Sequence, residues 1–326
     1  MRAIAMTRFG GPDVLFEADL PRPVARSGEV VVQVAYAAVN PADWKVREGW
    51  LAPYFSPVFP FVPGFDASGW VAQVGDGVED LVVGDRVVCA TNQGLGENGA
   101  YAEFVRAAAD RIVQLSDTVT LADAATLPTA GMTAWEAVCD VGRVSASQLV
   151  LVNGGAGGTG SFAVQLAKMR GARVAAICRR ENFAYVQAMG AERTIDYREG
   201  SVLDAVHNWA PRGVDLVVDT VGQGSLAEGL AILGSEGLIA HIATLISGER
   251  RADPETAARS GKHVALVSSS FPNQPHQLRG LVEALADDRI VAPARQTFPL
   301  ERAADAQARI QGGHVRGKLL LEVARE

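Results

Sequence analysis

LVLVNGGAGGTGSFAVQLAKMRGARVAAIC, residues 149–178, contains the clearest structural signal in the chain. A short apolar run passes through a glycine-rich turn into a segment whose apolar residues recur at helical spacing. Gly171 then stands where a left-handed helix C-cap is expected, and a second apolar run begins at once. The order predicts a strand over 149–153, a helix over 159–170 and a parallel strand over 173–178.

The glycine-rich turn has the chemistry of a dinucleotide-binding loop. Gly154, Gly157 and Gly160 give the spacing G-x-x-G-x-x-G, a variant of the dinucleotide fingerprint. Glycine permits the tight turn, the approach of backbone N–H groups to a pyrophosphate, and close packing of helix on strand. A plain glycine-rich turn is the alternative, but the complete strand–turn–helix–strand unit favours coenzyme binding. The predicted coenzyme contacts in the loop are Gly154, Ala156, Gly157, Gly158, Thr159 and Gly160.

The end of the second strand bears on the choice of coenzyme. An NAD site would place a carboxylate there for the ribose 2′-hydroxyl, whereas this chain has Cys178-Arg179-Arg180. Two guanidinium groups suit a 2′-phosphate, which they bind with charge-assisted hydrogen bonds. Tyr197 is placed to add a hydroxyl to the same pocket. The sequence therefore predicts NADPH as the cofactor, with ordinary surface charges as the alternative reading of both arginines.

The rest of the chain indicates two domains. From about residue 121 apolar runs alternate with helical stretches, which predicts a parallel, doubly wound α/β sheet. The first 120 residues instead contain short valine-rich runs cut by glycine, proline and aspartate, as in a β-barrel. Short strands return after Asp288 around a helix at 303–311, and we expect them to rejoin the first domain. The predicted domains are 1–122 with 288–326, and 123–287.

Composition excludes several classes of protein. The 326 residues are 48% hydrophobic and 21% charged, with a net charge of −7, so neither disorder nor a nucleic-acid partner is expected. The longest apolar stretches reach about ten residues, whereas a membrane span needs about 20. The three cysteines, Cys89, Cys139 and Cys178, are too scattered for a disulfide framework or a metal motif. A cytoplasmic location is therefore expected.

Several further motifs are distributed along the chain. In order, they are AVNPADWKVREG (38–49), PFVPGFDASG (60–69), VGDRV (83–87), GAYAEF (99–104), LPTAGMTAWEAV (127–138) and GGHVRGKLLL (312–321). Together with the glycine-rich loop they resemble the medium-chain dehydrogenase/reductase superfamily and, within it, the zinc-free quinone oxidoreductases, over essentially the whole chain. The resemblance implies a GroES-like partial β-barrel domain beside a Rossmann domain, a cleft between them for the nicotinamide, and a homodimer.

The sequence departs from the zinc-dependent relatives at the metal site. Those relatives place a catalytic cysteine near Asn40 and a Gly-His-Glu near residue 65, where this chain has Gly64-Phe65-Asp66. All five histidines follow residue 200, and the first 88 residues contain no cysteine. A zinc site needs about three protein ligands. We therefore expect no metal, and expect Asp66 to be a structural carboxylate paired with Lys45 or Arg86.

The resemblance also implies roles for single residues. It places Asn40 beside the nicotinamide ribose and the acceptor, Thr133 against the nicotinamide, and Tyr54 in a loop over the acceptor. The alternatives are an Asx turn for Asn40, a hydroxyl bonded within its own helix for Thr133, and a mere pocket cover for Tyr54. Asp43 is expected as a helix cap or ion-pair partner. The remaining predicted coenzyme contacts are Val221, Ala243, Thr244, Phe271 and Lys318.

These features predict an enzyme that transfers hydride from NADPH to a small apolar quinone or carbonyl compound. A quinone needs no Lewis acid, because its reduction gives an aromatic hydroquinone. Reduction of the C=C bond of an enone or enoyl thioester is the alternative chemistry, with Tyr54 as the candidate proton donor. A non-enzymatic NADPH-binding protein is the alternative of a different class.

Overall fold

The computed structural model describes residues 1–54, 57–226, 228–242, 249–268 and 274–324. The chain divides into two compact units. The first unit comprises Met1–Thr129, Asn273–Asp288 and Ala292–Glu326, and the second comprises Ala130–Pro272 and Arg289–Val291. The domain limits expected from the sequence differ from this division in three places: the first unit continues to Thr129 and includes the helix at 274–286, and Arg289–Val291 belongs to the second unit.

The second unit contains a six-stranded sheet in the order β10-β9-β8-β11-β12-β13. Every neighbouring pair is parallel, and the order reverses beside β8, as in a Rossmann fold. The doubly wound fold predicted from the sequence is therefore confirmed. The strands are β8 (Leu149–Asn153), β9 (Arg173–Ile177), β10 (Arg193–Ile195), β11 (Val214–Asp219), β12 (Leu233–Ile242) and β13 (His263–Val267).

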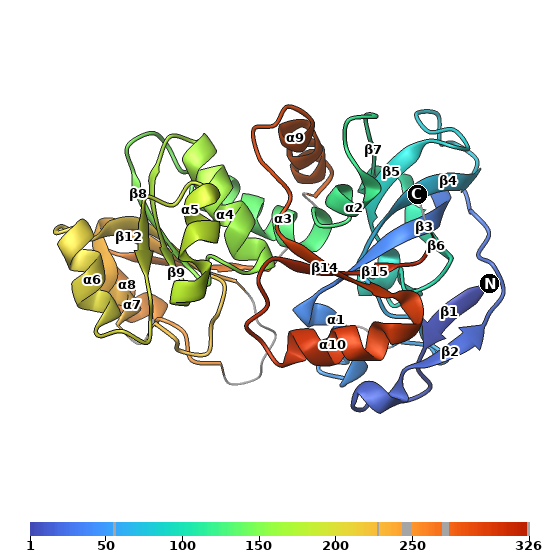
Figure 1. The fold of residues 1–326 in the computed structure, drawn as a ribbon, viewed down its shortest axis with the longest axis horizontal. Helices are drawn as coiled ribbons and strands as arrows, with labels where there is room; N and C mark the ends of the chain where they lie inside the picture. Colours follow the sequence, from blue (N-terminus) through green and yellow to red (C-terminus); the bar gives the residue numbers. More distant parts are fainter. Residues whose placement is uncertain (55–56, 227, 243–248, 269–273, 325–326) are drawn as a thin grey trace. The chain divides into compact units, whose positions relative to one another are not determined.

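Helices cover both faces of this sheet. Figure 1 shows α4 and α5 on one face and α6, α7 and α8 on the other. This arrangement follows from right-handed crossovers on either side of β8. The helical segment after β9 begins as a 3-10 turn over Arg180–Asn182 and is α-helical over Phe183–Ala188. The elements are α4 (Gly158–Met169), η5 (Arg180–Asn182), α5 (Phe183–Ala188), α6 (Val202–Trp209), α7 (Gly229–Ile232), α8 (Pro254–Arg259) and the π-helix η4 (Glu136–Val141).

The first unit contains a curved, mostly antiparallel sheet in the order β14-β15-β3-β4-β5-β7, with β6 also paired to β3. The C-terminal strand β15 lies antiparallel to β3, which confirms that the end of the chain rejoins the first domain. A separate pair, β1 and β2, completes the strands. Their bounds are β1 (Arg2–Ala5), β2 (Phe16–Asp19), β3 (Glu29–Val39), β4 (Asp66–Val74), β5 (Arg86–Ala90), β6 (Phe104–Ala108), β7 (Ile112–Gln114), β14 (Arg295–Pro299) and β15 (Lys318–Glu322).

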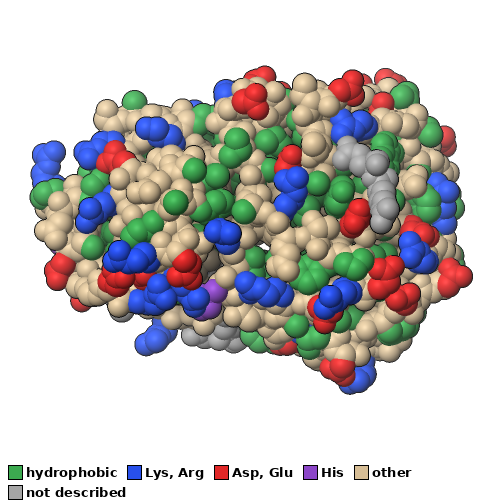
Figure 2. Space-filling view, viewed as in Figure 1, with side chains coloured by type: hydrophobic (Ala, Val, Ile, Leu, Met, Phe, Trp, Pro, Cys, Tyr) green, Lys and Arg blue, Asp and Glu red, His purple; other side chains and the backbone are tan. Residues whose placement is uncertain are grey.

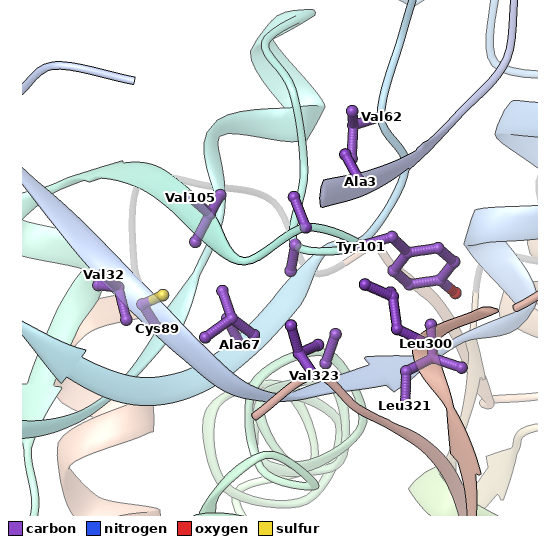
Figure 3. Packing of buried hydrophobic residues seen from close by; sticks show 14 of the residues in the cluster. Ala3, Val32, Val62, Ala67, Cys89, Tyr101, Val105, Leu300, Leu321 and Val323 are labelled. Atoms are coloured by element: carbon purple, nitrogen blue, oxygen red, sulfur yellow. The ribbon is translucent and has the colours of Figure 1, made fainter. Parts of the chain in front are cut away.

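The core of the first unit is built from small apolar side chains on the inner faces of these strands. Figure 3 shows Tyr101 in this cluster together with Leu300 and Leu321. The helices of this unit are α1 (Pro41–Arg47), α2 (Leu121–Ala124), α9 (Gln274–Ala286) and α10 (Ala303–Gln311), with the 3-10 turns η1 (Pro12–Val14), η2 (Asn92–Leu95), η3 (Ala109–Arg111) and η7 (Leu300–Arg302). Helix α3 (Pro128–Trp135) begins in the first unit and continues into the second.

The surface carries charges of both signs. On the face drawn in Figure 2, Lys and Arg side chains lie interspersed with Asp and Glu side chains. Among the described residues, no helix has the length and apolar character that crossing a membrane requires.

Candidate coenzyme and active site

The glycine-rich loop closes tightly at the carboxyl end of β8. Gly154 has a φ of 78°, a conformation that favours glycine. Its N–H group and that of Gly155 both donate to the carbonyl of Ile177 on β9, each at 3.1 Å. Gly157 then caps α4, which begins at Gly158. The loop therefore presents the amino end of a twelve-residue helix at the edge of the sheet.

Close packing explains a second glycine in the loop. A Cβ at Gly160 would lie 2.2 Å from the Gly154 carbonyl oxygen and 2.8 Å from the Gly155 Cα. Any side chain there would push α4 away from the loop. Ala156 is buried, whereas Gly157, Gly158 and Thr159 are partly exposed. The sequence signal thus corresponds to the backbone cradle that a pyrophosphate needs.

Three polar residues join the carboxyl ends of β8, β11 and β12. Asn153 Nδ2 donates to Asp219 Oδ1 at 2.8 Å, and His241 Nδ1 lies 3.0 Å from Asp219 Oδ2. Burial alone would raise the pKa of Asp219, but the hydrogen bonds from His241, Gly222 and Asn153 outweigh it, and the pKa is lowered. Asp219 is therefore an ionised, buried anchor between three strands.

The tautomer of His241 follows from its second nitrogen. Nε2 accepts the backbone N–H of Ala252 at 3.3 Å, so Nδ1 carries the proton and donates it to Asp219. Asp219 Oδ1 also accepts the N–H groups of Val221 at 3.2 Å and Gly222 at 3.1 Å. This network holds the loop with the partly exposed Val221, a predicted coenzyme contact. Sequence reasoning gave His241 no role, although its signal was a polar residue near the end of an apolar strand.

The predicted 2′-phosphate residues separate into two groups. Arg179 Nε donates to the hydroxyl of Tyr197 at 3.0 Å, which brings together two residues that are 18 apart in sequence. Its guanidinium also makes a loose ion pair, with NH1 3.8 Å from Glu181 Oε1. Both Arg179 and Tyr197 are partly exposed to solvent. Their polar groups therefore face outward near the carboxyl end of β9.

Arg180 is engaged differently. Its Nε donates to Glu199 Oε1 at 2.8 Å, and its NH2 donates to the other oxygen of that carboxylate. Its backbone N–H donates to Asp196, which also binds Arg198. Hydrogen bonds from Arg198 hold the pKa of Asp196 well below its usual range, so this carboxylate is ionised. Arg180 thus has a carboxylate partner before any ligand binds.

In the first unit, Asn40 is the N-cap of α1 and is only 1% exposed. Its Nδ2 donates to Asp66 Oδ2 at 2.8 Å. Its Oδ1 accepts a hydrogen bond from Lys318 Nζ. The structure therefore brings the predicted catalytic Asn40 and the predicted coenzyme residue Lys318 into direct contact.

Asp66 lies under this contact and is fully buried. Its Oδ1 accepts from the backbone N–H of Thr129 at 3.1 Å and from the Thr129 hydroxyl at 2.5 Å. The cation that faces Asp66 is Lys318, whose Nζ lies 3.9 Å from Oδ2. The expected partners were Lys45 and Arg86, and this expectation was wrong because β15, far away in sequence, delivers the ammonium. Burial raises the pKa of Asp66 and lowers the pKa of Lys318.

Asp43 stands at the third position of α1, as a helix-capping residue. Its Oδ2 accepts the backbone N–H of Asn40 at 2.6 Å and the Tyr101 hydroxyl at 3.1 Å. Its Oδ1 is buried and has no hydrogen-bond partner among the described residues. Burial raises the pKa of Asp43 to about 7. Sequence reasoning identified the cap but not this perturbed carboxyl.

The other predicted site residues lie in varied surroundings. Tyr54 is 72% exposed in the turn that follows α1, whereas Thr133 is buried within α3. Among the described residues, no group of three or more His, Cys, Asp or Glu side chains is arranged to hold a metal ion. Three predicted coenzyme contacts, Ala243, Thr244 and Phe271, lie outside the described residues.

Comparison with known proteins agrees with this architecture. A model described as the alcohol dehydrogenase GroES-like domain matches residues 26–117. A second, described as zinc-binding dehydrogenase, matches residues 189–321. The GroES-like character expected of the first domain is thus confirmed.

Individual relatives match the whole chain. The quinone oxidoreductase of Mus musculus is 31% identical over 98% of this chain and 97% of its own. A mycobacterial protein solved in complex with NADPH superposes with a TM-score of 0.88 at 30% identity, covering 99% of this chain and all of its own. A protein solved as an NAD-dependent alcohol dehydrogenase superposes with a TM-score of 0.91 at 28% identity and similar coverage. The chain belongs to the quinone oxidoreductase branch of the medium-chain dehydrogenase/reductase superfamily and is an oxidoreductase.

Proposed function

We propose that this enzyme is an NADPH-dependent quinone reductase that works without zinc. The observation that carries the choice of coenzyme is the Arg179–Tyr197 pair beside the glycine cradle. Gly154 and Gly155 bond to Ile177, and Arg179 follows only two residues later. The glycine loop after β8 and the Arg179–Tyr197 pair after β9 and β10 therefore lie at the ends of adjacent strands. A dinucleotide places its pyrophosphate and adenosine ribose at such strand ends. A guanidinium and a phenol suit a 2′-phosphate.

The residues of the second unit fit the coenzyme in a further respect. A Cβ would clash with neighbouring protein atoms at Gly154 and Gly160, so the tight path of the loop, which would bring its backbone close to a pyrophosphate, requires glycine at both positions. Gly157, Gly158 and Thr159 would direct backbone N–H groups at it, and the network around Asp219 would hold the loop at Val221. Bound NADPH would supply the hydride for the acceptor.

The chemistry of the donor set around Asn40 supports a reaction without zinc. A zinc site needs about three thiolate, imidazole or carboxylate ligands. Here Asn40 offers an amide, Asp66 a single carboxylate, and the ammonium of Lys318 contacts both residues. A divalent cation would have to displace this ammonium. A quinone suits such a site, because its reduction product is stabilised by aromaticity rather than by a metal.

Asn40 is the residue proposed to face the acceptor. Its carboxamide has a second N–H group beyond the one given to Asp66. That group would donate to the oxygen of the quinone as negative charge develops there. Exclusion of water at this depth strengthens such a hydrogen bond.

The enzyme is also proposed to form a homodimer through β13. This strand lies at the end of the described sheet, paired with β12 on one side. Leu266 on it is 52% exposed, which is unusual for an apolar residue in a parallel sheet. A second copy would cover this edge. We expect Leu266→Lys to shift the sedimentation coefficient from dimer to monomer, whereas an unchanged dimer would place the interface elsewhere.

A cytoplasmic location is proposed on the state of the cysteines. Cys89, Cys139 and Cys178 are all free. Burial raises the pKa of the Cys89 thiol to about 12, so it is unreactive. Free thiols of this kind are typical of a reducing compartment.

The choice of coenzyme is tested by substitution of single arginines. Arg179→Gln should raise KM for NADPH at least about tenfold, because charge-assisted hydrogen bonds contribute about 1.5–3 kcal/mol. KM for NADH should stay within about twofold, since NADH has no 2′-phosphate. Arg180→Gln is the matched control with a smaller effect, because Glu199 already binds that guanidinium. Equal changes for both coenzymes would refute the assignment.

The acceptor is tested with a panel of quinones, enals and enoyl thioesters under matched conditions. Initial rates are measured with NADPH, with and without a chelator. The proposal expects quinones to be the fastest class and the chelator to have no effect. Faster reduction of enones or enoyl thioesters would replace it with a C=C reductase, and a loss of activity with the chelator would refute the zinc-free mechanism.

A further inference from the structure

We propose that Lys318 and Asp66 are positioning residues that fix the carboxamide of Asn40, and that Lys318 acts through Asn40 rather than by contact with the coenzyme. The inference deepens the proposed function, on which the role of Asn40 toward the acceptor rests. We call Asn40, Asp66 and Lys318 the amide clamp. All three side chains are at least about nine-tenths buried, with exposures of 1%, 0% and 3%.

The clamp fixes which end of the amide points where. Oδ1 of Asn40 faces a cation, and Nδ2 faces a carboxylate. Rotation of the amide by 180° would set its NH2 group against the ammonium of Lys318 and its oxygen against Asp66. Both contacts would be repulsive, so a single orientation remains.

Strand register brings the three residues together. Strand β3 lies between β4 and β15, with Ala38 opposite Asp66 and Val39 opposite Leu319. Asn40 follows Val39 directly, so the register places Lys318, the first residue of β15, opposite Asn40. Asp66, the first residue of β4, is opposite Ala38, two positions before Asn40, and is reached by the Asn40 side chain diagonally across the sheet. The clamp is therefore set by the sheet and not by a loop, which makes its geometry reproducible.

Both outer members are held independently of Asn40. Thr129 binds Asp66 through its backbone N–H and its hydroxyl. The backbone N–H of Lys318 donates to the Ala294 carbonyl at 2.8 Å. Gly317 before it has a φ of 68°, and a Cβ there would lie 1.7 Å from the same carbonyl oxygen. This close approach fixes the entry of Lys318 into β15.

The clamp has a chemical consequence for the second side-chain N–H group of Asn40, the one that does not donate to Asp66. The ammonium at Oδ1 draws electron density toward the oxygen, which makes the amide nitrogen a stronger donor. The ammonium of Lys318 contacts Asn40 and Asp66, and the three side chains are buried away from solvent. Lys318 is therefore suited to orient and polarise the amide, and not to reach a phosphate.

A structural experiment tests the clamp without any substrate. The protein is labelled with 15N-asparagine, the Asn40 side-chain signal is identified by its loss in Asn40→Ala, and its hydrogen exchange is measured. Slow exchange is expected in the wild type and exchange at least about tenfold faster in Lys318→Met. Unchanged exchange in Lys318→Met would overturn the proposal. Because the single variant leaves Asp66 buried without its cation, Asp66→Asn with Lys318→Met gives a charge-neutral second variant, expected to exchange fast as well.

A double-mutant cycle tests the route of action. Lys318→Met should lower kcat with a quinone about tenfold or more and leave KM for NADPH within twofold, since misplacement of a catalytic group slows chemistry. In the Asn40→Ala background the same substitution should change kcat by less than about twofold. A rise in KM for NADPH of equal size in both backgrounds would overturn the proposal and make Lys318 a coenzyme contact. If the wild type reduces no quinone and the exchange result holds, the proposed function fails and the clamp stands.

Discussion

In the first unit, Asp43, Asp66 and Lys318 lie wholly buried around Asn40, whereas in the second unit Arg179, Arg180 and Glu199 lie partly in solvent beside the glycine loop. The perturbations have opposite directions. Burial raises the pKa values of Asp43 and Asp66 and lowers that of Lys318, which disfavours every charged form. At the surface, the hydrogen bonds from Arg180 outweigh desolvation and lower the pKa of Glu199, which favours the charged form.

The difference shows how the two groups of charges serve different tasks. Charges in the interior hold one geometry, because any rearrangement leaves an unpaired group away from water. Charges at the surface exchange partners at little cost, because water solvates whichever group is released. A clamp for a catalytic amide needs the first property. A phosphate pocket that fills and empties in each turnover needs the second.

Asp43 provides the strongest test of the contrast between the buried and the exposed charges, through the pH dependence of stability. Its folded pKa is raised from 3.8 to about 7, so its stabilising contribution is present below about pH 4 and is lost as the pH rises through 7. The unfolding free energy of the wild type should therefore fall relative to that of Asp43→Asn, by on the order of 4 kcal/mol between pH 4 and pH 8. Urea denaturation of both proteins across this range measures the difference.

Asp80→Asn, a change at an exposed carboxylate, is the control and should follow the wild type at each pH. A difference between wild type and Asp43→Asn that does not vary with pH would contradict the buried, perturbed carboxyl. It would also mean that the buried charges around Asn40 do not differ in this respect from the exposed charges beside the glycine loop.

The next effect concerns the buried ion pair as a unit. Lys318→Met should lower the unfolding free energy at pH 7 by roughly 3 kcal/mol, because it leaves Asp66 without its cation. Combining it with Asp66→Asn should recover most of this loss, since both charges are then absent. Thermal unfolding of the single and double variants decides the point. Equal losses in both would show that packing, and not charge, holds this part of the core.

The sequence predicted the sheet of the second unit closely, because its signals are local. The strand at 149–153 has the bounds expected from its apolar run, and the helix predicted over 159–170 is found over Gly158–Met169. The glycine loop could also be predicted from the sequence, because positions that need a positive φ or very close packing are occupied by glycine. Arg179 and Tyr197 were also placed in one pocket, because both follow neighbouring strands of a parallel sheet.

The first unit was predicted only in outline. Asp66 was recognised as a structural carboxylate, but its cation comes from Lys318, which lies 252 positions later in β15. No local pattern encodes a pairing between β15 and β3, and curved antiparallel sheets depend on such long-range register. His241 was missed for the same reason, since its partner Asp219 lies on a different strand. Burial of Asp43 likewise arises from the packing of Tyr101 and α1 together.

A weaker change in coenzyme affinity is expected from the exposed Arg180–Glu199 pair. Glu199→Gln releases Arg180, whose guanidinium is then free to turn toward a 2′-phosphate. KM for NADPH should fall about two- to threefold, the size expected when an exposed pair is exchanged, and KM for NADH should not change. Glu255→Gln removes the same charge from α8 of the same unit and controls for a general field effect. If both variants lower KM for NADPH equally, the gain is long-range electrostatics and Arg180 takes no part. A change above about tenfold would mean that this solvent-exposed pair is coupled as tightly as the buried one, and that exposure alone does not separate the two groups.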